Sequence, residues 1–189
     1  MNMSYDLVLI GDSLVFGYGV PYNNSFAYKL STSLNVTVTN KGINGDTTIS
    51  MLDRFYTDVI LYNPKYIFVM GGTNDLLLGK SVTSIIENIE LMILDAKKIS
   101  AKTYIGIPPC IIKDLAERLF MPSDFYTYAE NSLPILKNEL IKLCSKHNVQ
   151  YINFYDITFN NKSNIFVDGI HLNAIGNNLM YKEFCRVFS

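Results

Sequence analysis

Three residues in this 189-residue chain have the types and spacing needed for nucleophilic chemistry. Ser13 lies in "DLVLIGDSL", where an apolar run gives way to a Gly-Asp-Ser turn. His171 lies in "DGIH", three residues after Asp168. A hydroxyl nucleophile needs a base to accept its proton and a carboxylate to orient that base. The pattern predicts Ser13 as the nucleophile, His171 as the base and Asp168 as the orienting carboxylate.

Two further turns supply candidate donors for the oxyanion that acyl transfer creates. The first is "NKGINGDT" (40–47) and the second is "GGTND" (71–75). We expect the amides of Ser13 and Gly45 and the side-chain amide of Asn74 to converge on the oxyanion. Glycine lets a bare backbone approach a ligand closely, and a neutral asparagine amide donates without leaving a buried charge.

Polar residues beside these turns have simpler explanations. We interpret Asp12 as a turn residue that accepts local backbone amides, and Asp75 as a cap or brace of its loop. His147, the second of only two histidines, falls at a predicted helix end, where a positive group favours the helix dipole.

Composition bounds the class of protein. Hydrophobic residues make up 49% and charged residues 17% of the chain, which is typical of a globular domain. The net charge of −1 gives no basic field for nucleic acid. Three scattered cysteines (Cys110, Cys144 and Cys185) favour neither a disulfide framework nor a zinc site.

Short apolar runs alternate with stretches of helical period. The predicted strands are Tyr5–Ile10, Val36–Thr39, Tyr66–Met70, Thr103–Ile107 and Val149–Phe154. The predicted helices are Asn24–Leu34, Thr48–Tyr62, Ser84–Ser100, Asp124–Lys146 and Asn173–Phe188. Ser84 and Glu87 have capping-box spacing, and Pro134 is expected to kink or divide its helix.

Five strand–helix alternations predict an α/β protein with a parallel sheet covered on both faces. Ligands of such sheets bind outside the carboxyl ends of the strands, which is where the four turns fall. We expect one domain over residues 1–189, with no cofactor, no bound metal and no membrane span. The N-terminus lacks the basic region of a signal peptide, so we expect a cytoplasmic protein.

The ordered turns resemble the SGNH (GDSL) hydrolase family of esterases and lipases. GDSL occurs at 11–14, GINGD at 42–46, GGTND at 71–75 and DGIH at 168–171, spanning nearly the whole chain. The resemblance implies a three-layer α/β/α fold of flavodoxin-like shape with a five-stranded parallel sheet. It also implies Ser13 as nucleophile, Gly45 and Asn74 as oxyanion donors, and Asp168 and His171 as the rest of a triad.

Two functions of other classes compete with an esterase. A metal-dependent phosphoesterase would use oxygen and nitrogen ligands. Its ligands would be Asp12, Asn74, Asp75, Asp168 and His171. It would leave Ser13 without a task. A non-catalytic flavodoxin-like binding module would favour more Ser, Thr and Gly at the first turn than Leu14-Val15-Phe16 provides.

The substrate is expected to be a small ester. Val15, Phe16, Leu77 and Leu78 are the candidate substrate-binding residues, since they follow the nucleophile and the oxyanion turn. They favour a short- to medium-chain acyl ester, with lysophospholipid or thioester as variants and a carbohydrate O-acetyl ester as the alternative. The stretch Leu119–Tyr128 is either surface packing or a flap, and we expect it on the opposite side of Ser13 from Leu76–Leu78. Oligomeric state cannot be read from the sequence.

Overall fold

A five-stranded parallel sheet forms the centre of the computed structural model, which describes residues 5–188. The strand order is β2-β1-β3-β4-β5. The strands are β1 (Leu7–Gly11), β2 (Val38–Gly42), β3 (Tyr66–Met70), β4 (Lys102–Ile107) and β5 (Gln150–Asn153). Residues 1–4 and 189, which belong to the expected single domain and the expected signal-free N-terminus, lie outside the described residues.

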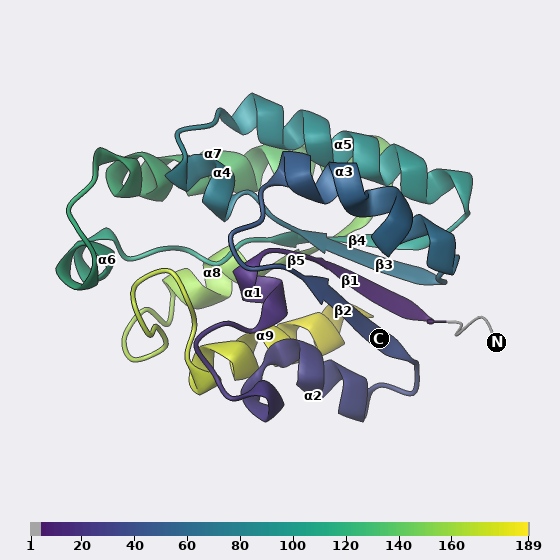
Figure 1. Ribbon diagram of the computed structural model, residues 1–189, viewed down its shortest axis with the longest axis horizontal. Helices are drawn as coiled ribbons and strands as arrows, with labels where there is room; N and C mark the ends of the chain where they lie inside the picture. Colours follow the sequence, from purple (N-terminus) through teal and green to yellow (C-terminus); the bar gives the residue numbers. More distant parts are fainter. Residues whose placement is uncertain (1–4, 189) are drawn as a thin grey trace.

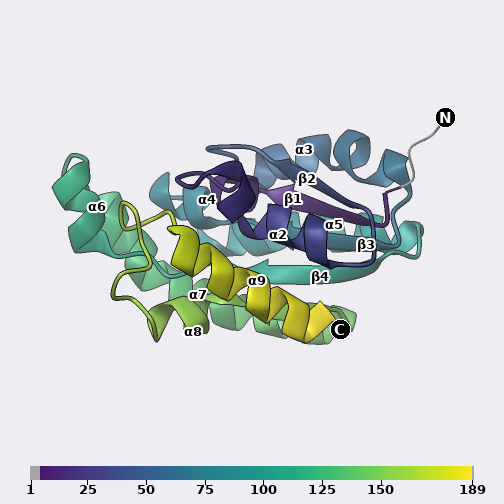
Figure 2. The same ribbon diagram turned by 90° about the horizontal axis from the view of Figure 1, so that it is seen from below.

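Helices cover both faces of the sheet, giving three layers (Figures 1 and 2). One face carries α3 (Thr48–Asp58), α4 (Thr73–Leu77), α5 (Val82–Lys98) and α7 (Asp124–His147). The other carries α1 (Ser13–Phe16), α2 (Phe26–Ser33), α8 (Phe154–Phe159) and α9 (Ala174–Phe188). The remaining elements are α6 (Lys113–Leu119) and the 3₁₀ turns η1 (Tyr22–Asn24) and η2 (Ile60–Tyr62). The predicted α/β/α fold is confirmed.

The core is divided by the sheet into two layers. Val8, Ile10, Val69 and Ile105 pack against the α3/α5/α7 side, whereas the alternate strand residues pack against α2 and α9. All five residues of β1 are buried, as expected for a strand covered on both faces.

Several elements differ from the sequence predictions, among them β2, α5 and α7. The edge strand β2 starts two residues later than predicted and includes Asn40 and Lys41, because its backbone pairs with β1 whatever the side-chain polarity. Helix α5 is capped by Ser81, whose hydroxyl accepts from the Ser84 N–H, so the predicted capping box at Ser84 is wrong. Pro134 lies inside one continuous α7 and does not divide it.

The carboxyl ends of β1, β2 and β3 lie level with one another. Gly11 pairs with both Gly42 and Met70, so the three following turns leave the sheet at the same height. From there the chain runs to α1 and α2 on one face after β1, but to α4 and α5 on the other face after β3 (Figure 1). This reversal of winding is where α/β sheets open a binding crevice.

Candidate active site

Ser13 is the first residue of the short helix α1, directly after β1. Asp12 caps this helix, because its Oδ1 accepts a 2.9 Å hydrogen bond from the Leu14 N–H. The predicted structural role of Asp12 is therefore seen in the geometry. The cap fixes the turn that presents Ser13 at the sheet edge.

The three predicted triad residues form a continuous hydrogen-bonded chain. Ser13 Oγ lies 2.9 Å from His171 Nε2, and His171 Nδ1 lies 2.7 Å from Asp168 Oδ2. A carboxylate only accepts hydrogen bonds, so Nδ1 carries the ring hydrogen and Nε2 is left to accept the Ser13 hydroxyl. The arrangement can remove a proton from Ser13 Oγ.

A tight turn brings Asp168 and His171 together. Asp168 Oδ1 accepts from the backbone N–H groups of Ile170 (2.9 Å) and His171 (2.7 Å), while Gly169 between them has φ +88°. The Val167 N–H closes the turn on the His171 carbonyl at 2.8 Å. Both carboxylate oxygens of Asp168 therefore accept hydrogen bonds from residues of the same turn, Asp168–His171.

The pKa values of the two aspartates near the site, Asp168 and Asp12, are shifted in opposite directions. Burial opposes ionisation of Asp168, but hydrogen bonds from the His171 ring and from two backbone N–H groups outweigh it, so its pKa lies below the usual value. Burial raises the pKa of Asp12 to about 7, against the lowering effect of the Leu14 hydrogen bond and of nearby His171. Asp168 is therefore the carboxylate suited to support a cationic imidazole.

The predicted oxyanion donors lie on the turns that follow β1, β2 and β3. Gly45 has φ +79°, and no atom lies within 4 Å of where a Cβ would be, so the backbone is open to a ligand. Within residues 5–188, the N–H groups of Ser13 and Gly45 have no hydrogen-bond partner. Asn74 Nδ2 donates to the Asp46 carbonyl at 2.8 Å and has a second hydrogen to give.

Asp75 braces the turns that carry the candidate oxyanion donors, as its predicted structural role requires. Its Oδ2 accepts from the Thr48 N–H at 2.9 Å and its Oδ1 from the Thr48 hydroxyl at 2.7 Å. The carboxylate thereby joins the turn after β3 to the N-terminus of α3, where negative charge is stabilising.

Two residues near the site were missed from the sequence. The Tyr18 ring contacts the His171 ring, with centroids 4.5 Å apart, and the Tyr18 N–H donates to the Ser13 carbonyl. Arg54, on α3, binds the side chain of Asp46 beside Gly45. A lone Tyr and a lone Arg carry no motif, so only the folded arrangement reveals them.

The predicted substrate-binding residues are placed differently from one another. Val15 is fully buried against Gly11 in the core, so its prediction as a substrate contact is wrong. Phe16 is 49% exposed and Leu78 is 61% exposed, whereas Leu77 is half-buried against the core. Leu76 is fully buried. Of the leucine run, Leu78 is therefore the most available to a ligand.

The segment Leu119–Tyr128 contacts the two residues that directly follow the leucine run, Gly79 and Lys80. The Tyr128 hydroxyl donates to the Lys80 carbonyl at 2.9 Å, and the Phe125 ring packs where a Gly79 side chain would be. The expected placement on opposite sides of Ser13 is therefore wrong. Phe125 and Tyr128 thus pack beside the end of the leucine run, and Leu119, Phe120 and Phe125 expose apolar side chains.

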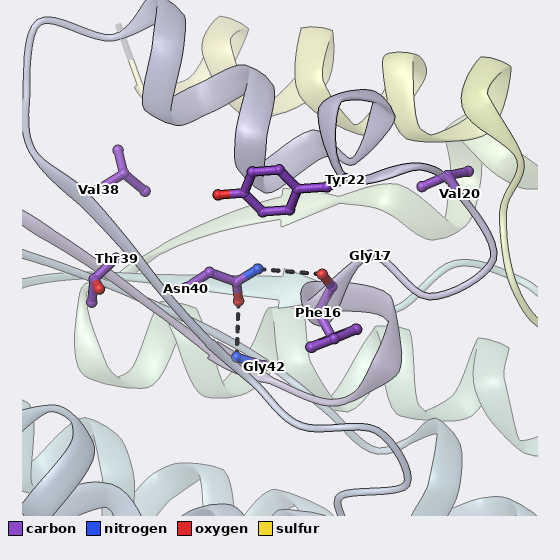
Figure 3. A pocket seen from close by; sticks show the side chains of 8 residues that line it. All are labelled: Phe16, Gly17, Val20, Tyr22, Val38, Thr39, Asn40 and Gly42. Carbon is purple, nitrogen blue, oxygen red and sulfur yellow. Dashed lines mark hydrogen bonds between the residues drawn. The ribbon is translucent and has the colours of Figure 1, made fainter.

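An open pocket of about 490 Å³ lies beside α1 (Figure 3). The loop from α1 to α2 lines one side and the edge strand β2 the other. Its lining residues are Phe16, Gly17, Val20, Tyr22, Val38, Thr39, Asn40 and Gly42. The Asn40 amide ties the two walls together, since it donates to the Val15 carbonyl and accepts from the Gly42 N–H. Phe16 therefore faces this pocket.

The ligand set of the phosphoesterase alternative does not gather into a metal site. Within residues 5–188, no three His, Cys, Asp or Glu side chains are grouped to hold a metal ion. Asp75 and Asp168 instead accept hydrogen bonds from Thr48 and His171.

His147 lies in the last turn of α7, where it contacts Glu90 at 2.5 Å. No helix in the described part of the chain has the length and hydropathy of a membrane span.

Comparison with known proteins assigns the chain to a family. Residues 9–179 match the GDSL-like lipase/acylhydrolase family, and the protein belongs to it. A member of the lipolytic G-D-S-L family from Veillonella parvula superposes with a TM-score of 0.84 at 25% identity, covering 96% of this chain and 97% of that one. An acetylxylan esterase from Geobacillus stearothermophilus shares the fold at 16% identity (TM-score 0.79, covering 100% and 97%).

Curated relatives match over shorter stretches. An arylesterase from Vibrio mimicus is 32% identical over 56% of this chain and 57% of its own length. A Bacillus subtilis lipoprotein, YqeF, is 39% identical over 37% of this chain and 32% of its own. The chain thus spans under two thirds of each relative. The family assignment therefore rests on the match over residues 9–179.

Proposed function

We propose that the protein is a serine esterase that hydrolyses carboxylic esters through an acyl-enzyme intermediate. The observation that carries this proposal is the chain from Ser13 Oγ to His171 Nε2 (2.9 Å) and from His171 Nδ1 to Asp168 Oδ2 (2.7 Å). Both bonds are needed, since the carboxylate orients the base that accepts the hydroxyl proton.

In the proposed reaction, Ser13 Oγ attacks the ester carbonyl carbon while His171 Nε2 takes the hydroxyl proton. The carbonyl oxygen becomes an oxyanion, which receives hydrogen bonds from the Ser13 and Gly45 N–H groups and from Asn74 Nδ2. Collapse of this intermediate breaks the bond to the alcohol, and His171 gives its proton to the leaving oxygen. Water then attacks the acyl-Ser13 ester while His171 takes a water proton; the acyl–Oγ bond breaks, His171 returns the proton to Ser13 Oγ, and the acid is released.

We propose a short- to medium-chain acyl group as the preferred part of the substrate. Support comes from Leu78, which is exposed directly after the oxyanion turn, and from the exposed apolar segment that packs beside it. An apolar wall next to the reacting carbonyl favours an alkyl chain over a polar one.

Covalent labelling with a fluorophosphonate tests the proposal, because the reagent reacts with an activated serine hydroxyl. The wild type should be labelled at Ser13 and should hydrolyse p-nitrophenyl butyrate. Ser13→Ala should lose both properties while keeping its melting temperature, since it removes one hydroxyl, bonded to His171, and leaves the backbone of the turn unchanged. Activity retained in EDTA separates this reaction from a metal-dependent one. Turnover by folded Ser13→Ala would contradict the assignment.

A further inference from the structure

All three guanidinium nitrogens of Arg54, on α3, donate hydrogen bonds to neighbouring groups. Its Nε and Nη2 donate to Asp46 Oδ2 at 2.8 and 2.6 Å, and Nη2 also donates to the Gly11 carbonyl at 3.1 Å. Its Nη1 donates to Asp58 Oδ2 at 2.8 Å. The side chains of Arg54 and Asp46 are only 15% and 6% exposed. These are largely desolvated, charge-assisted bonds, which are stronger than surface ion pairs.

The partners of Arg54 belong to the turns that carry the proposed oxyanion donors. Asp46 directly follows Gly45, and Gly11 lies two residues before Ser13. The Asp46 carbonyl also accepts the Asn74 side-chain amide at 2.8 Å. Through Asp46 and Gly11, one guanidinium is therefore linked to all three donor positions.

The Gly45 turn has little else to fix it. Ile43, Asn44 and Gly45 are exposed, and Asp46 is the first buried residue after them. The backbone bonds in the turn are from the Ile43 N–H to the Gly11 carbonyl at 3.0 Å and from the Asp46 N–H to the Ile43 carbonyl at 3.2 Å. The position of the Gly45 N–H thus depends on where the Asp46 side chain is held.

We propose that Arg54 is a positioning residue for the oxyanion hole, setting the Gly45 N–H and the Asn74 amide relative to Ser13. The inference rests on the proposed esterase function and assigns a task that Ser13, His171 and Asp168 do not perform. Lysine is not equivalent at this position, because one ammonium cannot replace three separate nitrogens that donate to Asp46, Gly11 and Asp58 in fixed directions.

Arg54→Lys tests the proposal with charge preserved. Displacing preorganised groups by about 1 Å costs up to ~10²-fold in rate, so we expect kcat to fall by about 10- to 100-fold. KM should change less than about threefold, because the lost interactions act mainly in the transition state. A trifluoromethyl ketone, whose adduct with Ser13 carries an oxyanion, should bind more weakly by a factor that follows the fall in kcat/KM.

Arg186→Lys is the matched control. Arg186 makes a similar fork with Glu183 (2.8 and 2.7 Å) on the exposed face of α9, away from the carboxyl ends of the strands. The Arg186→Lys variant should therefore keep the wild-type kcat and inhibitor affinity. If Arg54→Lys is not folded at the assay temperature, Asp46→Asn gives the same test. Its amide oxygen accepts from Arg54 without charge, and we expect a loss of about 3- to 30-fold in kcat with KM preserved.

The outcomes separate this inference from the proposed function. A wild type that neither hydrolyses esters nor reacts with a fluorophosphonate would overturn the esterase itself. An active wild type with unchanged kcat in folded Arg54→Lys or Asp46→Asn would overturn the positioning role alone. A rise in KM with kcat unchanged, or a kcat loss without weaker ketone binding, would also contradict it.

Discussion

Asn74 Nδ2 donates a 2.8 Å hydrogen bond to the backbone carbonyl of Asp46, the residue after Gly45. A primary amide has two hydrogens, so this bond orients the group and leaves the second hydrogen to be given elsewhere. The same contact links the turns after β2 and β3. Two donors from different turns are thereby held in fixed relation before any substrate binds.

Replacing Asn74 by alanine should lower kcat by ~10²–10³ with a smaller change in KM, the cost of one preorganised oxyanion donor. Steady-state kinetics on p-nitrophenyl butyrate measure both constants. Asn161→Ala is a control, because it removes a surface side-chain amide that donates to the Ile157 carbonyl at a similar distance of 2.7 Å. A rise in KM alone for Asn74→Ala would make Asn74 a substrate-binding residue.

Replacing Asp168 by asparagine should reduce kcat by about 10⁴, because an amide no longer holds the His171 ring with Nε2 free to accept a proton. Stability should also respond to pH. The folded pKa of Asp168 lies below its ordinary value, so its ionised form adds stability above about pH 4 that is lost as pH falls through the folded pKa. Urea unfolding should show the wild-type advantage shrinking on acidification. An advantage independent of pH would mean that Asp168 is not stabilised as a carboxylate.

Asp12 should behave in the opposite way. Its folded pKa is raised to about 7, so the folded state holds a proton that the unfolded state releases near pH 4, and stability falls as pH rises between these values. Asp12→Asn removes the charge but keeps an oxygen for the Leu14 N–H. Its unfolding free energy relative to wild type should increase from pH 4 to pH 7, with an upper bound of about 4 kcal/mol.

Asp53→Asn, at an exposed position on α3, is the control for this series. It should show little difference from wild type across the same pH range. Denaturant unfolding at several pH values measures both variants. An Asp12→Asn profile as flat as that of Asp53→Asn would show that burial does not disfavour the charge of Asp12.

Much of the fold and part of the candidate site follow from local sequence. The residues Ser13, Asp168 and His171 were found because each sits in a short turn next to a strand or helix, and the structure brings them into hydrogen-bonding contact. Their catalytic roles stay predictions. Val15 was misplaced because it continues an apolar run, and the run alone does not tell which side chain of a one-turn helix faces the core.

Features that depend on how elements pack were not predictable. The edge strand β2 extends through polar Asn40 and Lys41 because pairing with β1 is a backbone property. Arg54 lies eight residues after Asp46, and their contact exists only because α3 turns back over the end of β1. Pattern analysis detects the exposed and buried periodicity of a helix, but not which neighbouring turn one of its side chains reaches.

The last prediction concerns acyl-chain preference and the wall formed by Leu78 and the segment Leu119–Tyr128. If this wall covers an acyl chain, each buried methylene contributes up to ~0.8 kcal/mol, nearly fourfold in kcat/KM. The logarithm of kcat/KM for p-nitrophenyl esters should therefore rise over the first several carbons and then level off. Leu78→Ser should flatten the rise while leaving acetate hydrolysis nearly unchanged.

Leu61→Ser provides a matched control for the same series. Leu61 is 61% exposed, as is Leu78, but it lies in η2, before β3 and therefore at the edge of the sheet opposite to Ser13. Its variant should keep the wild-type slope of log kcat/KM against chain length, so a change in both variants would indicate a general effect on the protein. A wild-type maximum at acetate with a steep loss at butyrate would contradict the acyl-wall prediction and favour an O-acetyl esterase, because such a site holds only the smallest acyl group.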